Sequence, residues 1–129
     1  MLADWTVGNW ILHAARRRVI VDNFRNYAAD MRRGAAILLA PSERAGVEAA
    51  RASGVRYVMV RSPWLTLAPT LGMLGENVNY LMAMLIDPHD PGRRQEVFSP
   101  RVTRTVGFAL CERRGEGLRG FRLRAEFPD

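Results

Sequence analysis

Apolar side chains recur at helical spacing in several parts of the chain. The clearest run lies beyond Pro63, and its apolar residues are three or four positions apart: Leu71, Leu74, Val78, Leu81 and Leu85. The same spacing follows Asp4, a residue that can cap a helix, and it ends at three consecutive arginines. Shorter helices are predicted over residues 42–52 and from Pro100 onward, since proline favours the first turn of a helix.

Three short segments have the composition of β-strands. Residues 19–21 (VIV) are β-branched, residues 55–60 (VRYVMV) follow Gly54, and residues 121–127 (FRLRAEF) alternate between apolar and polar side chains. A helix that ends at glycine before a strand is typical of α/β proteins. We therefore predict a single α/β domain over residues 1–129, with a small sheet of about three strands flanked by about four helices.

The basic residues are all arginines. The chain has 19 of them and no lysine, against 13 acidic residues, and its formal net charge is +6. A GC-rich genome produces such a bias toward arginine and alanine without selection for function. The positive surface still favours anionic partners, such as nucleic acid, phospholipid headgroups or phosphorylated ligands. Because the arginines are scattered and no nucleic-acid motif accompanies them, nucleic acid is not the favoured partner.

Few residues have the chemistry of a catalytic or metal site. Cys111 is the single cysteine, and the chain has two histidines. His89 lies between Asp87 and Asp90, but the Pro- and Gly-rich composition around it is more typical of a solvated turn than of a zinc site. The glycine-rich residues 115–120 precede a predicted strand, whereas a phosphate-binding loop joins a strand to a helix. We therefore predict no catalytic residue, no metal ligand and no cofactor in this domain.

No segment has the length and apolarity of a membrane span. The longest apolar run, residues 71–86, is interrupted by Glu76, Asn77 and Asn79. The N-terminus also lacks the basic-then-apolar order of a signal peptide. We expect the chain to be soluble, and its immediate start in helix-like sequence is compatible with a domain cut from a longer protein.

Three stretches of the sequence follow a known pattern in the same order. They are residues 4–11 (DWTVGNWI), residues 17–24 (RRVIVDNF) and residues 42–60, which end in GVRYVMV. The chain thereby resembles the extracytoplasmic C-terminal domain of the oligosaccharyltransferase catalytic subunits of bacteria and archaea. That family has a Trp-Trp-Asp-x-Gly segment, an Arg-Pro-Val-Val-x-Asn-Asn-Phe segment and a Gly-Val-x-Tyr-Val-Val strand. Residues 120–123 are also similar to the start of its closing strand.

The resemblance implies that catalysis lies outside these residues. The intact protein would be a polytopic membrane glycosyltransferase, which transfers a glycan from a lipid-linked pyrophosphate donor to a protein asparagine outside the cytoplasm. Its catalytic carboxylates and its divalent cation, Mn²⁺ or Mg²⁺, would lie in the membrane part. The partners would be that membrane part, the lipid-linked oligosaccharide and the acceptor polypeptide. This domain would contribute to recognition of the Ser or Thr of an Asn-x-Ser/Thr acceptor.

The family's acceptor-binding segment carries over in part. Trp5 matches the second tryptophan and Gly8 the glycine, whereas Thr6 stands in place of the aspartate. A threonine hydroxyl still forms hydrogen bonds, but it brings no carboxylate. The resemblance therefore implies Trp5, Thr6 and Gly8 as acceptor-binding residues. Tryptophans on one helix, such as Trp5 and Trp10, commonly pack in a core, which is the alternative position for Trp5.

The three arginines that close the first predicted helix are candidates for a contact at the membrane. Arg16, Arg17 and Arg18 would face lipid headgroups or the protein's membrane part.

Two other hypotheses about the function of the chain remain open. In one, the chain is a standalone basic module that binds RNA or lipid headgroups, with a steep salt dependence. In the other, it is a soluble enzyme that uses His89 with its aspartate neighbours.

Overall fold

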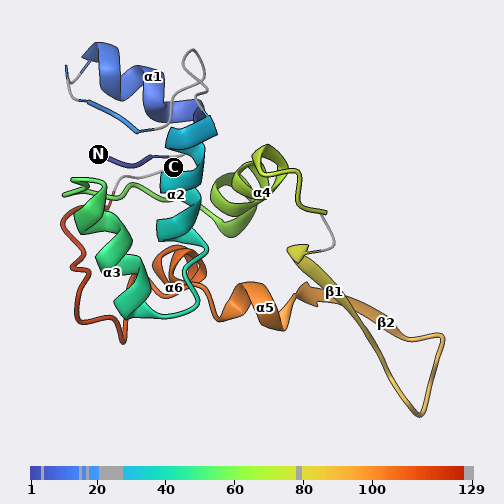
Figure 1. Ribbon diagram of the computed structural model, residues 1–129. Coiled ribbons are helices and arrows are strands. Elements are labelled where there is room, and N and C mark those ends of the chain that lie inside the picture. The colour runs from blue at the N-terminus through green and yellow to red at the C-terminus, as the bar shows by residue number, and fades with distance from the viewer. Residues whose placement is uncertain (4, 15, 17, 21–27, 78–79, 127–129) are drawn as a thin grey trace.

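The structure of the chain is a computed structural model, which describes residues 1–3, 5–14, 16, 18–20, 28–77 and 80–126. The elements follow in the order α1 (Trp5–Ala14), α2 (Ala28–Leu38), α3 (Glu43–Ala52), α4 (Pro63–Met73), β1 (Met82–Ile86), β2 (Arg94–Phe98), α5 (Pro100–Thr103) and α6 (Val106–Glu112). The helices gather around α2, and the hairpin of β1 and β2 extends away from them (Figure 1).

Helix α2 is the centre of the helical body. It contacts α3, α4 and α6, and it buries Gly34, Ala35, Ile37 and Leu38. The buried cluster continues into the neighbouring segments through Leu2, Ala50, Leu67, Leu71, Leu81 and Val102. Each aliphatic side chain removed from water in this way contributes about 1.5–3 kcal/mol. The core therefore lies among the helices and not on the two-stranded sheet.

Helix α6 lies very close to the end of α2. A Cβ atom at Gly107 would be 2.6 Å from the carbonyl oxygen of Leu38 and 2.7 Å from Cδ2 of Leu67. Both distances are shorter than any ordinary contact of a side-chain carbon. The missing side chain at Gly107 is therefore what allows α6 to approach both α2 and α4.

Several helices begin after a hydroxyl residue whose side chain accepts a hydrogen bond from the backbone N–H three residues later: Ser42, Ser62, Ser99 and Thr105. The helix predicted over residues 42–52 is confirmed as α3. The helix predicted after Pro100 is confirmed in two parts, because the chain leaves helical geometry after Thr103 and the Thr105 cap starts α6. Local capping chemistry therefore sets most of the helix starts that the sequence predicts.

The single helix predicted through residues 71–85 is wrong. Helix α4 begins at Pro63 and ends at Met73, and Gly75 follows with a φ of +71°, outside the helical region. Residues 82–86 form β1 instead, which pairs antiparallel with β2 in a register that runs from Met82↔Phe98 to Ile86↔Arg94. Apolar residues at helical spacing also fit a strand that is apolar on both faces, and spacing alone does not separate the two cases.

Residues 55–60, predicted as a strand, do not form one; they pair through one isolated parallel bridge, between Val58 and Leu2. Two backbone hydrogen bonds of 2.9 Å join Leu2 to the residues on either side of Val58. The carbonyl of Met1 accepts a further hydrogen bond of 2.9 Å from the N–H of Ile20, in another predicted strand. The first residues of the chain therefore lie between two segments that were both expected in the sheet.

The α/β class is confirmed, but the strands do not lie where the sequence placed them. Residues 19–20 and 121–126 are not in strands, and Val21 and residue 127 lie outside the described residues. The N–H of Gly120 donates to the carboxylate of Glu43, so the last predicted strand starts against α3 and not in a sheet. Within the described residues the sheet has two strands, where the sequence predicted about three.

Candidate functional site

The predicted acceptor-binding segment forms the start of α1. Trp5 is the first residue of the helix, Thr6 is the second, and Gly8 follows within the same turn. Gly8 is buried, while the side chains of Trp5 and Thr6 lie outside the described residues. The contact of these three residues with an acceptor therefore stays a prediction.

The residues just before α1 are among the most buried of the described chain. Leu2 is 1% exposed and Ala3 is 2% exposed. The amino group of Met1 donates to the carbonyl of Arg18 over 3.0 Å, and burial lowers the pKa of this amino group from its ordinary value. Because its preceding residues are packed in the core, α1 starts from an anchored point and not from a free terminus.

Two of the three candidate membrane-facing arginines have a described position. Arg16 and Arg18 are exposed, and Arg17 lies outside the described residues. Arg16 has a φ of +49°, which turns the chain away from the helix direction at the end of α1. Both exposed guanidinium groups are accessible to anionic groups, and their contact with lipid headgroups stays a prediction.

The loop around His89 is held by its own aspartates. The carboxylate of Asp87 accepts a hydrogen bond of 2.9 Å from the N–H of His89, and that of Asp90 accepts one of 3.1 Å from the N–H of Gly92. These are the side-chain-to-backbone bonds of aspartates in tight turns. Among the described residues, no group of three or more His, Cys, Asp and Glu side chains could hold a metal ion. The geometry therefore favours a turn for this segment.

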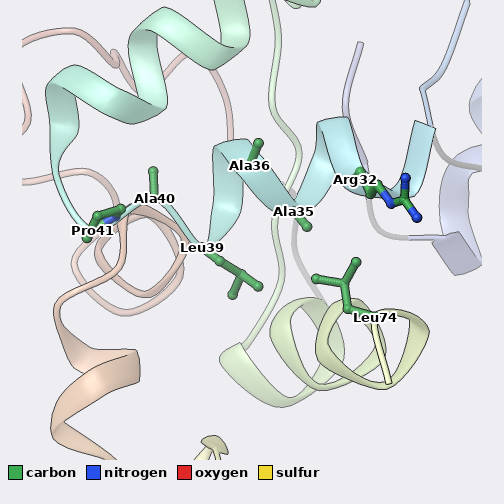
Figure 2. A pocket seen from close by; sticks show the side chains of 7 residues that line it. All are labelled: Arg32, Ala35, Ala36, Leu39, Ala40, Pro41 and Leu74. Atoms are coloured by element: carbon green, nitrogen blue, oxygen red, sulfur yellow. The ribbon is translucent and has the colours of Figure 1, made fainter. Parts of the chain in front are cut away.

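A shallow hollow of about 360 Å³ lies between α2 and the end of α4 (Figure 2). Its lining is mostly apolar, and Arg32 is the one charged residue in it: Arg32, Ala35, Ala36, Leu39, Ala40, Pro41 and Leu74. Next to it, Arg33 pairs with Asp30 at 3.1 Å. This hollow was not predicted from the sequence, although Arg32, Ala36 and Leu39 follow the i, i+4, i+7 spacing of one helix face.

The described helices are all too short or too polar to cross a membrane. No protein-family model matches the chain. A curated relative does: the dolichyl-phosphooligosaccharide-protein glycotransferase 1 of Archaeoglobus fulgidus is 30% identical over 129 residues. The match covers 100% of this chain and 20% of that protein, so the chain spans about one-fifth of its relative's length.

A solved structure has the same fold. It is the crystal structure of the C-terminal globular domain of an oligosaccharyltransferase from Archaeoglobus fulgidus, which superimposes with a TM-score of 0.58. The match covers 91% of this chain and 71% of that domain, at 22% sequence identity. The sequence similarity, which covers all 129 residues of this chain, and the shared fold thus point to the same kind of protein. The chain resembles the C-terminal domain of the oligosaccharyltransferase catalytic subunits, as residues 4–11, 17–24 and 42–60 predicted.

Proposed function

We propose that this chain serves as the C-terminal domain of an oligosaccharyltransferase-like membrane glycosyltransferase and contributes to acceptor recognition, not to catalysis. The observation that carries this proposal is the similarity of all 129 residues to one-fifth of an archaeal glycotransferase, with the fold of such a domain. In the intact protein the domain lies on the extracytoplasmic side. The catalytic carboxylates and the divalent cation belong to the membrane part.

The proposed acceptor contacts are Trp5, Thr6 and Gly8. Their position at the start of α1 supports this, because buried Leu2 and Ala3 hold that end of the helix against the body. A binding element on an anchored helix loses less conformational entropy when it meets an extended polypeptide than a mobile loop does.

Thr6 decides which acceptor chemistry fits. Its hydroxyl both donates and accepts hydrogen bonds, whereas the aspartate found in the family only accepts them when ionised. An acceptor hydroxyl therefore keeps a partner at Thr6, but it loses the stronger bond that a charged acceptor group gives. We propose that this domain binds its acceptor polypeptide more weakly than a relative with aspartate at this position.

The experiment is acceptor-peptide binding by the chain, with an Asn-x-Thr peptide as the probe. Trp5→Ala should weaken binding at least about tenfold, since an aromatic anchor at an interface typically contributes 2 kcal/mol or more. Trp64→Ala is the matched control, because Trp64 is 48% exposed on α4 and belongs to a different helix. Equal binding by wild type and Trp5→Ala would remove Trp5 from the site.

The salt dependence of binding distinguishes the alternative proposal, a standalone basic module, from acceptor recognition. Binding of RNA through several arginine–phosphate contacts falls steeply as salt rises, because each contact releases counterions. Peptide recognition at Trp5 and Thr6 depends on salt only weakly. The same titration repeated with a single-stranded RNA probe at 50 and 200 mM salt distinguishes the two.

A further inference from the structure

The outer half of the β-hairpin exposes apolar side chains to water. Met84, Leu85 and Ile86 are consecutive in β1 and are 50%, 56% and 56% exposed. The hairpin extends away from the helical body, so the body does not cover these side chains (Figure 1). Two-stranded hairpins are at best marginally stable in water without an apolar surface to pack on.

Strand β1 is apolar on both faces at its outer end, while the β2 residues opposite Met84, Leu85 and Ile86 are Glu96, Gln95 and Arg94. Successive residues of a strand point to opposite faces, so Met84 and Ile86 share one face and Leu85 is on the other. A flat protein surface covers one face of a hairpin, while the other remains in water. An apolar medium that surrounds the strand covers both, and the interfacial region of a lipid bilayer is such a medium.

Basic side chains occupy the same end of the hairpin. The register places Arg94, the first residue of β2, directly opposite Ile86, and Arg93 lies just before the strand; both arginines are exposed. Paired residues of antiparallel strands have their side chains on one face, so a guanidinium group lies beside the apolar side chain of Ile86. Guanidinium groups bind phosphate through two parallel hydrogen bonds, and every phospholipid headgroup carries a phosphate.

Three acidic residues lie at this end, and one of them, Glu96, is exposed in β2 directly opposite Met84. The carboxylates of Asp87 and Asp90 accept hydrogen bonds from backbone N–H groups of the turn. An aromatic side chain lies at the base of the hairpin, because the rings of Trp64 and Phe98 are 6.5 Å apart and Trp64 is half exposed. Tryptophan is enriched where proteins meet the water–lipid interface. The hairpin thus has exposed apolar side chains and two guanidinium groups at its tip, and an exposed aromatic ring at its base.

We propose that the tip of the β1–β2 hairpin, formed by Met84, Leu85, Ile86, Arg93 and Arg94, inserts into the interfacial region of an anionic phospholipid membrane. The net charge of +6 attracts the chain to such a surface, and the apolar strand then enters the boundary between headgroups and acyl chains. This site is separate from Trp5, Thr6 and Gly8. It goes beyond the proposed function, because it requires neither an acceptor nor catalysis.

The test is co-sedimentation of the full chain with vesicles of phosphatidylcholine alone and of phosphatidylcholine with one-quarter phosphatidylglycerol. Wild type should bind both, more strongly with phosphatidylglycerol. The Leu85→Gln/Ile86→Gln variant should bind at least about tenfold more weakly to each, because two apolar side chains no longer enter the lipid. Arg93→Gln/Arg94→Gln should reduce the preference for phosphatidylglycerol. Leu123→Gln is the matched control, since Leu123 is 55% exposed and distant from the hairpin in sequence.

Three results would overturn the proposal. One is no sedimentation of the wild type with either vesicle, and another is an equal loss in Leu123→Gln. The third is concentration-dependent dimerisation that Leu85→Gln/Ile86→Gln abolishes without any vesicle binding, which would assign the strand to a second copy of the chain. Thermal unfolding of each variant shows that it is folded, which these exposed substitutions should permit. The vesicle assay contains no acceptor peptide, so its result does not depend on whether the chain binds an acceptor.

Discussion

Leu2 and Val58 pair in a parallel bridge that joins the start of the chain to its middle. The N–H of Leu2 donates to the carbonyl of Tyr57, and the carbonyl of Leu2 accepts from the N–H of Met59, both over 2.9 Å. The side chain of Leu2 is 1% exposed and belongs to the main buried cluster. Helix α1, with its proposed acceptor contacts, begins beyond this point, so the position of the site depends on the core.

Leu2→Ala should lower the free energy of unfolding by about 2–5 kcal/mol, because it removes apolar contacts and leaves a cavity. Urea unfolding followed by circular dichroism measures this change. Leu123→Ala is the control, since Leu123 is 55% exposed, and its effect should stay within about 0.5 kcal/mol. A loss at Leu2 as small as that of the control would show that the Leu2 side chain does not anchor the start of the chain in the core.

Gly107→Ala should destabilise the protein by about 1–3 kcal/mol or more, because its methyl group would overlap the backbone of α2 and the side chain of Leu67. Gly72→Ala gives the opposite expectation. Gly72 lies within α4, and a Cβ atom there meets nothing within 4 Å, so alanine should stabilise the helix by up to about 1 kcal/mol. Thermal unfolding of both variants compares them directly, and the two shifts should have opposite signs.

Ser99→Ala should cost about 1–3 kcal/mol, since the hydroxyl has two partners in a buried position. It accepts a hydrogen bond of 3.2 Å from the N–H of Val102, and it donates to the carbonyl of Tyr80. Alanine would remove the cap and also the hydrogen-bond donor to the half-buried carbonyl of Tyr80. Ser62→Ala is the control with the same role as a helix cap, but Ser62 is exposed. Chemical denaturation should show the smaller loss at Ser62.

The sequence predicted the helices that local signals specify. Ser42 with Pro41 marked the start of α3, and Gly54 marked its end, because capping and glycine conformation depend on neighbouring residues alone. The formation of strands, by contrast, depends on pairing with residues that are distant in the sequence. Nothing local in residues 55–60 shows that Leu2 pairs with them, and Met82–Ile86 becomes a strand because Arg94–Phe98 lies beside it.

The candidate site was predicted from a short matching segment, not from chemistry. Trp5 and Gly8 stood out because they fit a family pattern, and the position of that segment at the start of α1 follows from the fold. The hollow beside Arg32 and the apolar tip of the hairpin were not predicted. Both depend on which side of an element the core leaves uncovered, and that is decided by tertiary packing.

In the proposed function, the start of α1 recognises an acceptor polypeptide. Two-dimensional NMR of the isotope-labelled chain, titrated with an Asn-x-Thr peptide, tests it most directly. The backbone amides of Trp5, Thr6 and Gly8 should shift with peptide concentration, and Trp5→Ala should abolish these shifts while Trp64→Ala preserves them. Shifts confined to Arg32, Leu39 and Leu74 around the hollow, or no shifts at all, would contradict the claim.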